Sequence, residues 1–258
     1  DPMATGLLVL GVEGATRLLT FIVGLDKTYE ATIRLGATTD SDDADGVITA
    51  RADASRVSAV EDDAIRAGIA LLTGEISQVP STVSAIKVAG RRAYALARAG
   101  ETVQLAPRNV TISRFEVQSI RRSADAIDLD VIVDCSTGTY IRALARDLGA
   151  SLEVGGHLTS LRRTRIGPFE VADAAHVDAI ASEHLLPPAP VASSILGAFP
   201  VSDDEARDLR HGKKIVGSAE RLTTKLAAAI TPAGDLVGIV ERRGADIKSA
   251  MNMPEVQE

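Results

Sequence analysis

The chain has few of the residues that carry redox, metal or disulfide chemistry. Its 258 residues include one cysteine, no tryptophan, three tyrosines and four phenylalanines. A single cysteine excludes an intramolecular disulfide and is typical of a protein from a reducing compartment. Because aromatic residues are so few, the core must consist mainly of Ala, Val, Leu and Ile, and a tyrosine in a polar setting becomes conspicuous.

Long apolar runs are also missing. The most apolar stretches cover residues 7–12 and 18–25 and are separated by Glu13, Thr16 and Arg17. Neither approaches the roughly 20 residues that a bilayer-spanning helix needs, and nothing resembles a signal peptide. We therefore expect a cytoplasmic protein without a membrane segment.

Motifs for nucleotide, metal and nucleophile chemistry are absent as well. The sequence contains no GxxxxGK[ST], no GxGxxG and no GxSxG motif, and its four histidines and one cysteine lack metal-ligand spacing. Cys135 falls on the apolar side of an alternating run, which indicates a small buried residue rather than a nucleophile. These absences argue against a nucleotide-phosphate site, a metal site and a serine or cysteine nucleophile, so no metal ligands are predicted.

Negative charge predominates overall but is unevenly distributed. The net charge is −7, which by itself argues against a nucleic-acid partner. Residues 38–63 carry eight acids and two arginines, whereas residues 80–170 carry thirteen basic and nine acidic residues, a local charge of +4. A polyanion responds to such a local basic face, although a solvated charged surface explains the same pattern.

Hydrophobic periodicity predicts a mixture of strands and helices. Four strands are expected, at 7–12, 29–36, 109–118 and 128–135. Four helices are expected, at 15–23, 58–74, 93–100 and 140–152. The third strand changes phase near Arg114, which predicts a bulge. The second helix is expected to open on a capping box formed by Ser58 and Glu61, and the acidic residues 39–46 to form a loop.

The last part of the chain has a different pattern. Residues 185–194 contain three prolines and no charge, which predicts a linker. Beyond it, Ser202 and Glu205 form the capping box of a short helix, and a β-hairpin is expected within 226–243. Residues 195–258 are thus predicted to form a small β-rich module.

Several short polar motifs lie at the ends of predicted elements, where functional residues tend to gather. Taken alone, Asp1 reads as a helix cap and Tyr29 as a half-buried strand residue. Arg142 is more informative, because an arginine in a first helical turn opposes the helix dipole unless an anion compensates it. The basic pair Arg162 and Arg163 is either an RNA-facing rim or a solvated turn.

Taken in order, these motifs resemble the TruB-type tRNA pseudouridine synthase family, in its bacterial, actinobacterial form. DPMATGLL is similar to the family's GTLDPxATGxL motif, entered at the aspartate. Four further family motifs are matched by KTYEATIRLG with TDSDDADG, VPSTVSAIKVAGRRAYALAR, CSTGTYIRALARDLG and GGHLTSLRRTRIGPF. The resemblance covers about residues 1–175, and the three tyrosines, Tyr29, Tyr94 and Tyr140, all fall on motif positions.

The resemblance implies an α+β fold of the pseudouridine synthase type, with a mixed, largely antiparallel sheet flanked by helices. It places a catalytic domain at 1–184 and a small PUA-like RNA-binding domain at 195–258, on either side of the linker. It also implies the activity, which is isomerisation of the T-loop uridine (uridine 55) of tRNA to pseudouridine by base flipping, without a cofactor.

By the same resemblance, Asp1 is the catalytic carboxylate. It must be ionised either to attack the sugar or base or to stabilise a developing cationic sugar. Arg142 pairs with it, and Tyr29 stacks on the target base and is a candidate proton shuttle. Contacts to the substrate are expected from Tyr140, Leu161, Arg17, His157, Arg162 and Arg163.

Two rival functions remain open at this point. One is a non-catalytic RNA-binding or tRNA-folding protein, which the set of Asp1, Tyr29 and Arg142 disfavours because binding alone needs no carboxylate near phosphates. The other is a guide-RNA-dependent pseudouridine synthase, whose basic tails and partner-binding extensions are not visible here. We expect a monomer that acts on the T-arm of tRNA without an obligate protein partner. We also expect the family's segment ahead of the aspartate to be missing from this chain.

Overall fold

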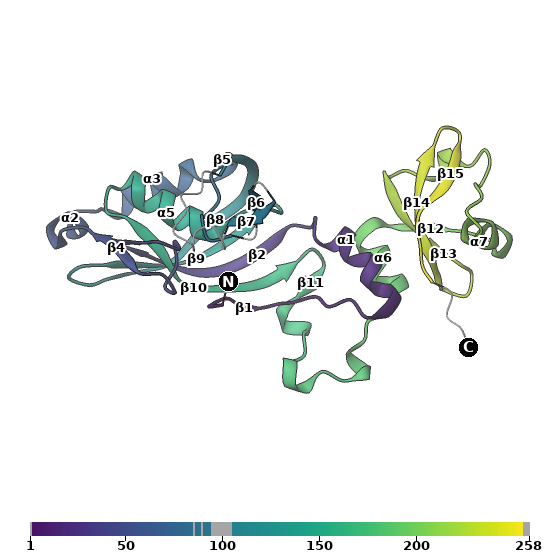
Figure 1. Cartoon of the computed structure of the whole chain (residues 1–258), viewed down its shortest axis with the longest axis horizontal. Coiled ribbons are helices and arrows are strands. Elements are labelled where there is room, and N and C mark those ends of the chain that lie inside the picture. Colours follow the sequence, from purple (N-terminus) through teal and green to yellow (C-terminus); the bar gives the residue numbers. More distant parts are fainter. Residues whose placement is uncertain (1, 85, 89, 94–104, 255–258) are drawn as a thin grey trace. The chain divides into compact units, whose positions relative to one another are not determined.

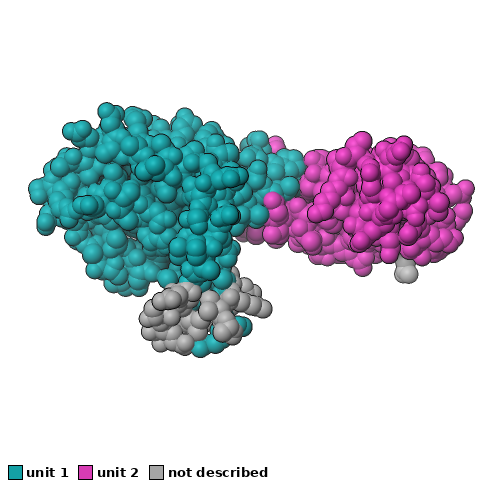
Figure 2. Space-filling model, turned by 90° about the horizontal axis from the view of Figure 1, so that it is seen from above, with its two compact units in different colours: residues 1–7, 25–172 teal, residues 8–24, 173–258 magenta. Residues whose placement is uncertain are grey.

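The computed structural model describes residues 2–84, 86–88, 90–93 and 105–254 of the chain. It contains two compact units, which Figure 2 shows in different colours. Unit 1 comprises residues 1–7 and 25–172, and unit 2 comprises residues 8–24 and 173–258. Two predictions lie outside the described residues: the placement of Asp1 and, from residue 94 on, the helix expected at 93–100.

Unit 1 is built on a seven-stranded sheet (Figure 1). Its strands run in the order β1 (Thr5–Gly6), β10 (Gly156–Ile166), β2 (Lys27–Leu35), β9 (Ile127–Cys135), β8 (Arg108–Arg122) and β5 (Gly74–Gln78), with β11 (Phe169–Glu170) beside β10. Only the pair of β1 and β10 is parallel among these described strands. The predicted mixed, largely antiparallel sheet is confirmed. Two small hairpins complete the strands of this unit: β3 (Ala37–Thr39) with β4 (Ile48–Arg51), and β6 (Lys87–Val88) with β7 (Arg91–Arg92).

Helices cover one face of this sheet. Helix α5 (Ile141–Ser151) packs against β10 and β2, and α3 (Asp62–Leu71) packs against α5, as Figure 1 shows. The alternating strands turn their aliphatic side chains toward these helices, so that Ile33, Leu129 and Leu148 are fully buried. Burial of each such side chain contributes about 1.5–3 kcal/mol relative to exposure. This layer of helix on sheet is what positions the residues of the candidate site.

Two predicted elements of the first part of the chain are wrong. No strand covers residues 7–12, where Leu8 and Leu10 are 68% and 63% exposed. Periodicity cannot separate a buried strand from an apolar segment that runs over the surface. The expected capping box also fails, because the Ser58 hydroxyl donates to the Ser55 carbonyl and Glu61 is the N-cap residue of α3. The helix is therefore split into α2 (Ala54–Ser58) and α3.

Unit 2 contains a four-stranded sheet. The order is β12 (Ala198–Pro200), β13 (Leu226–Ile230), β14 (Leu236–Arg243) and β15 (Asp246–Asn252), which confirms the predicted hairpin as β13 and β14. Helix α7 (Asp203–Arg210) begins with the predicted capping box. The Ser202 hydroxyl accepts from the Glu205 amide at 3.2 Å, and the Glu205 carboxylate accepts from the Ser202 amide at 2.9 Å. Short helical turns complete the described elements: η1 (Glu13–Leu18), α1 (Leu19–Ile22), η2 (Val171–Asp173), η3 (Val177–Ala179), η4 (Ser182–His184) and η5 (Ala219–Arg221).

The proline-rich stretch predicted as a linker is mostly helical. Residues Pro188–Leu196 form α6, in which proline at the first positions is tolerated because those amides have no partner within a helix. Ala189 and Ala192 of α6 are buried in one apolar cluster with Ile239 of the sheet and Leu18 of η1. The apolar face of this segment thus outweighs its prolines, and residues 8–24 join unit 2.

Within the part of the chain that the structure describes, no helix combines the length and the apolar character that crossing a bilayer requires.

The lone cysteine lies at the end of β9 and is expected to be inert in the native protein. Burial raises the pKa of the Cys135 thiol to about 11, so the reactive thiolate is scarce at neutral pH. We expect a disulfide reagent such as DTNB to label native protein at least about 10²-fold more slowly than urea-unfolded protein, measured by absorbance. Rapid stoichiometric labelling of the native protein would contradict the buried placement.

Candidate active site

The N-terminal segment runs along strand β10 at the edge of the unit 1 sheet. Thr5 and Gly6 pair in parallel with Arg162 and Arg163. The Arg163 guanidinium donates two hydrogen bonds to the Leu7 carbonyl, at 2.9 and 2.7 Å. Gly6 has a φ of 95°, and a Cβ atom there would lie 2.2 Å from the Arg163 carbonyl oxygen. Only glycine fits this approach, so residues 5–7 lie directly against β10.

Tyr29 and Leu161 lie on the face of the sheet that α5 covers. Tyr29 of β2 is opposite Arg163 of β10, and Ala31 is opposite Leu161. Residues two apart in a strand point to the same face, and both Tyr29 and Leu161 pack in the core cluster of unit 1. Burial raises the pKa of the Tyr29 phenol, while a hydrogen bond from Arg163 and its charge act in the opposite direction. The phenol is therefore neutral at physiological pH.

Arg142 is buried in the first turn of α5 and faces the loop that follows β3. Its Nη1 atom lies 3.2 Å from Oδ2 of Asp43, and the two side chains are only 5% and 4% exposed. The same nitrogen donates to the Ser41 carbonyl at 2.9 Å, and Nη2 donates to the Val83 carbonyl at 2.8 Å. Asp43 is thus an anion of the kind that an arginine at a helix start requires.

The loop that carries Asp43 is anchored to β10 and meets a second arginine. The Leu158 amide donates to the Asp42 carbonyl at 3.0 Å, and Asp43 and Leu158 form an isolated parallel β-bridge. One turn after Arg142, Nη1 of Arg146 lies 3.3 Å from Oδ2 of Asp42. Burial raises the pKa of the Asp42 carboxyl, and the positive charge of Arg146 offsets this only in part.

Sequence reasoning missed the roles of these two aspartates. It treated them as part of an acidic turn, because turn composition is a local signal and their partners lie about a hundred positions away. The signal that could have found them is the arginine pair at i and i+4. Two guanidiniums on one helix face need two anions, and adjacent aspartates in a loop can supply them.

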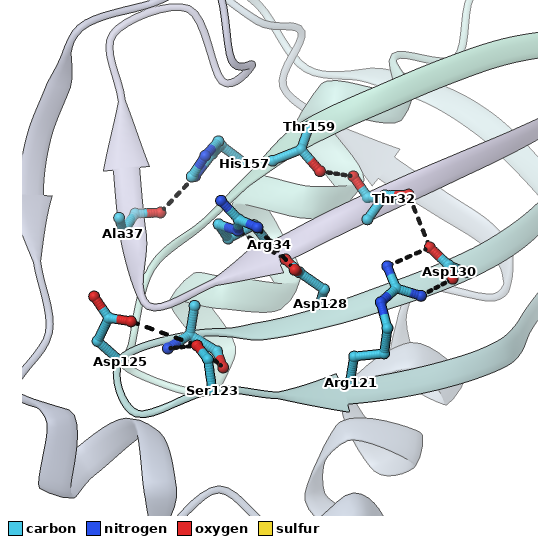
Figure 3. A network of polar contacts seen from close by, with 11 residues as sticks. Thr32, Arg34, Ala37, Arg121, Ser123, Asp125, Asp128, Asp130, His157 and Thr159 are labelled. Carbon is cyan, nitrogen blue, oxygen red and sulfur yellow. Dashed lines mark hydrogen bonds and ion pairs between the residues drawn. The ribbon is translucent and has the colours of Figure 1, made fainter.

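The other predicted site residues are placed differently from one another. Tyr140 is half-buried at the N-cap position of α5, two residues before Arg142. Arg162 is exposed, and its Nη1 lies 3.4 Å from the Thr5 hydroxyl. His157 is 6% exposed, and its Nδ1 is 3.0 Å from the Ala37 carbonyl (Figure 3). Contrary to the prediction, His157 is therefore not a surface contact for RNA.

Arg17 belongs to unit 2. It lies in η1, is exposed, and donates through Nη1 to the Asn252 carbonyl of β15 at 2.6 Å. This bond fastens the η1 segment to the sheet of unit 2, which is a structural role that sequence reasoning did not assign to Arg17.

The sheet face opposite the helices carries a ladder of ion pairs between strands β2, β9 and β8 (Figure 3). Arg34 binds both carboxylate oxygens of Asp128, at 2.7 and 2.8 Å. Arg121 binds Asp130, which also accepts from the Thr32 hydroxyl at 2.8 Å. Of the thirteen basic residues in 80–170, six are paired with carboxylates among the described residues: Arg114, Arg121, Arg122, Arg142, Arg146 and Arg165. Three of their partners, Asp42, Asp43 and Asp62, lie outside residues 80–170, so the local charge of +4 overstates the positive charge that is available to RNA phosphates.

This ladder predicts a loss of stability in acid. Arg34 and Arg121 hold the pKa of Asp128 and Asp130 below the ordinary value of 3.8. As the pH falls, the unfolded chain therefore takes up protons first, and the contribution of the ladder is lost below about pH 4. Changing Asp128 and Asp130 to asparagine should make the free energy of unfolding decline less steeply as the pH falls from about 6 to 3. Urea unfolding at several pH values measures this free energy. The control is Glu170→Gln, which removes an exposed acid of β11. A decline of the double variant parallel to that of the parent protein would contradict the prediction.

Comparison with known proteins bears on nearly the whole chain. Residues 1–141 match the family described as TruB family pseudouridylate synthase (N terminal domain). The chain belongs to the TruB family. Residues 142–187 match the tRNA pseudouridylate synthase B C-terminal domain, and residues 197–254 match the tRNA Pseudouridine synthase II, C terminal, domain.

Members of the TruB family with curated names are highly similar. The tRNA pseudouridine synthase B of Leifsonia xyli is 52% identical over 256 residues, which is 98% of this chain and 85% of that protein. The protein of the same name from Rhodococcus jostii is 50% identical over 97% of this chain and 81% of its own length. The expected bacterial, actinobacterial form of the family is thereby confirmed.

Solved structures extend the TruB comparison to the fold. The "Crystal Structure of a Cbf5-Nop10-Gar1 Complex" has a TM-score of 0.67 at 21% identity and covers 99% of this chain and 73% of that chain. The "Structure of H/ACA RNP bound to a substrate RNA containing 2'-deoxyuridine" has a TM-score of 0.64 at 20% identity and covers 95% of this chain and 71% of that one. At such low sequence identity, the structural similarity establishes the fold alone. It confirms the predicted α+β pseudouridine synthase architecture.

Proposed function

We propose that the protein is a tRNA pseudouridine synthase that isomerises the T-loop uridine, at tRNA position 55, without a cofactor. The observation that carries this proposal is the buried guanidinium of Arg142, held at the start of α5 beside the buried Asp43. A guanidinium in an enclosed site keeps a neighbouring carboxylate ionised, which is what the reaction requires of Asp1. The names of the close relatives support the same function.

The reaction exchanges one bond for another within the substrate. The bond between N1 of uracil and C1′ of ribose breaks, C5 bonds to C1′, the C5 proton leaves, and N1 gains a proton. In our proposal Asp1 is the carboxylate that either forms a covalent adduct or stabilises the cationic sugar. Arg142 holds Asp1 ionised and oriented, so the isomerisation depends on both residues.

Tyr29 is proposed to stack on the flipped uracil and to serve the proton transfer. Its neutral phenol packs on the same face of the sheet as Leu161, and aromatic stacking on a base contributes about 1–3 kcal/mol. Tyr140 and Leu161 are proposed as walls of the uracil pocket. Extruding a stacked base costs a few kcal/mol, which favours a pocket with such apolar walls.

Contacts to the RNA backbone are proposed for three arginines. Arg162 is exposed and Arg163 half-buried beside the N-terminal segment in unit 1, whereas Arg17 is exposed in unit 2. Phosphate contacts of this kind supply much of the affinity for tRNA and weaken with salt. We further propose that the protein acts on free tRNA as a monomer, in the cytoplasm, without an obligate protein partner, and that residues 195–258 assist as a PUA-like RNA-binding domain.

Tritium release tests the proposed reaction. The protein is incubated with tRNA carrying [5-³H]uridine, and the expected result is release of one tritium per tRNA to water. A tRNA with cytidine in place of the T-loop uridine is the control and should release none. Binding of tRNA without tritium release would favour the RNA-binding alternative, and release only with an added guide RNA and partner proteins would favour a guide-dependent enzyme.

A further inference from the structure

A buried glutamine holds the start of α5 from a neighbouring strand. Gln78 is the last residue of β5, directly before the VPSTVSAIK segment, and is 1% exposed. Its Oε1 accepts a hydrogen bond from the Tyr140 amide at 2.9 Å, and its Nε2 donates one to the Tyr140 carbonyl at 3.1 Å. One side-chain amide therefore binds both backbone groups of a single residue.

The N-cap position of α5 explains why this pairing matters locally. The backbone amide of an N-cap residue has no partner within the helix, and the side chain of Tyr140 makes no capping hydrogen bond. Gln78 provides that partner from outside the helix. A primary amide has the donor and the acceptor needed to match a peptide N–H and C=O at once. Other neutral side chains of that length lack one or both groups.

The segment that follows Gln78 holds the same helix at two further points. The Val79 carbonyl accepts from Nη2 of Arg146 at 2.7 Å, and the Val83 carbonyl accepts from Nη2 of Arg142 at 2.8 Å. Residues 78–83 thus contact the N-cap residue and the first two turns of α5. Of these three contacts, the one made by Gln78 comes from a side chain, so it can be removed by substitution.

We propose that Gln78 is a positioning residue of the isomerisation site. By fixing the backbone of Tyr140, it sets where the Tyr140 ring and the Arg142 guanidinium meet the uracil and Asp1. The roles of those residues rest on the proposed function, whereas the hydrogen bonds of Gln78 do not. Gln78 acts through α5 and is not itself a catalytic residue.

Single-turnover kinetics tests this role. Gln78→Met keeps the length and approximate volume of the side chain but loses both hydrogen bonds. Since a misplacement of about 1 Å can cost about 10²-fold in rate, we expect the tritium-release rate with excess enzyme to fall about 10- to 100-fold, with the tRNA dissociation constant within about threefold. Gln118→Met, the same change at an exposed position of β8, is the control and should leave both quantities unchanged.

A parent-like rate for Gln78→Met would overturn the proposal. If the melting temperature falls while the rate stays parent-like, the pairing only stabilises the fold. If Gln78→Met does not fold, Gln78→Asn replaces it, because the shorter amide cannot reach both groups of Tyr140. A parent-like rate of this variant overturns the proposal, and a reduced rate with intact tRNA binding supports it.

Fluorine NMR separates this inference from the proposed function. The chain has three tyrosines and no tryptophan, so 3-fluorotyrosine gives three resonances, and Tyr29→Phe and Tyr140→Phe assign two of them. Gln78→Met should shift or broaden the Tyr140 resonance and leave that of Tyr29 in place. An unmoved Tyr140 resonance would overturn the proposed positioning of Tyr140 by Gln78. If the parent protein releases no tritium, the proposed function fails, but this experiment still decides whether Gln78 positions Tyr140.

Discussion

Replacing Arg142 by methionine should lower the single-turnover rate of pseudouridine formation by about 10³-fold or more. Preorganised charge at a developing ionic site is worth about 10²–10³ in rate per donor, and Arg142 is proposed to hold the reactive carboxylate ionised as well. Lysine should not restore activity. Its single ammonium cannot reproduce the fork that reaches Asp43, Ser41 and Val83 at once.

The same substitution should also destabilise the protein, because it leaves Asp43 buried opposite an apolar side chain. Breaking one partner of a buried ion pair costs about 3–5 kcal/mol in the free energy of unfolding. Adding Asp43→Asn to the Arg142→Met protein should recover part of that free energy without recovering the rate. Urea unfolding and single-turnover tritium release, measured on the same preparations, separate these two consequences.

Arg146 offers a matched control for Arg142. It lies one turn further along α5, is paired with Asp42 and Asp147, and is more exposed. Arg146→Met should therefore lower stability while keeping the rate within about tenfold of the parent protein. If both variants lost activity equally, the effect of Arg142 would come from damage to α5 rather than from its place in the site.

The predictable part of this fold is the part that local periodicity encodes. Strands β2 and β9 alternate between buried and polar residues, and α5 follows its apolar spacing, so these elements could be located before the structure was known. The bulge expected near Arg114 is present as a register shift between Ile112 and Arg114. Local periodicity gave a wrong prediction where the structure of a segment depends on its packing or exposure in the folded protein. The prolines of α6 were misjudged because this helix packs into an apolar cluster of unit 2. Residues 7–12 were misjudged because an apolar run with exposed Leu8 and Leu10 has the same local pattern as a buried strand.

The candidate site could be predicted only as far as motifs identify residue types. Tyr29, Leu161 and Arg142 were singled out from the motifs, and the structure places them on or beside one helix-covered face. Asp43 and Gln78 were not, because each acts on a partner far away in the sequence. The Gln78 contact, for example, spans 62 positions. A pairing of this kind is set by the sheet register and by the course of a loop, neither of which composition reveals.

Replacing Asp1 by asparagine should abolish isomerisation. The amide is almost the same size as the carboxylate but can neither attack carbon nor stabilise a cation by its charge. Loss of an enzymatic nucleophile lowers the rate by about 10⁵- to 10⁶-fold, which for this reaction is below detection. Affinity for tRNA should stay within about threefold of the parent value, because phosphate contacts supply most of the binding free energy.

Conversion of the T-loop uridine of tRNA through Asp1 is tested by one paired measurement. Tritium release from [5-³H]uridine tRNA is followed for the parent protein and for Asp1→Asn at equal tRNA occupancy. We expect one tritium to be released per tRNA by the parent protein and none by the variant. Release by the Asp1→Asn protein at the parent rate, or no release by the parent protein on fully bound tRNA, would contradict it.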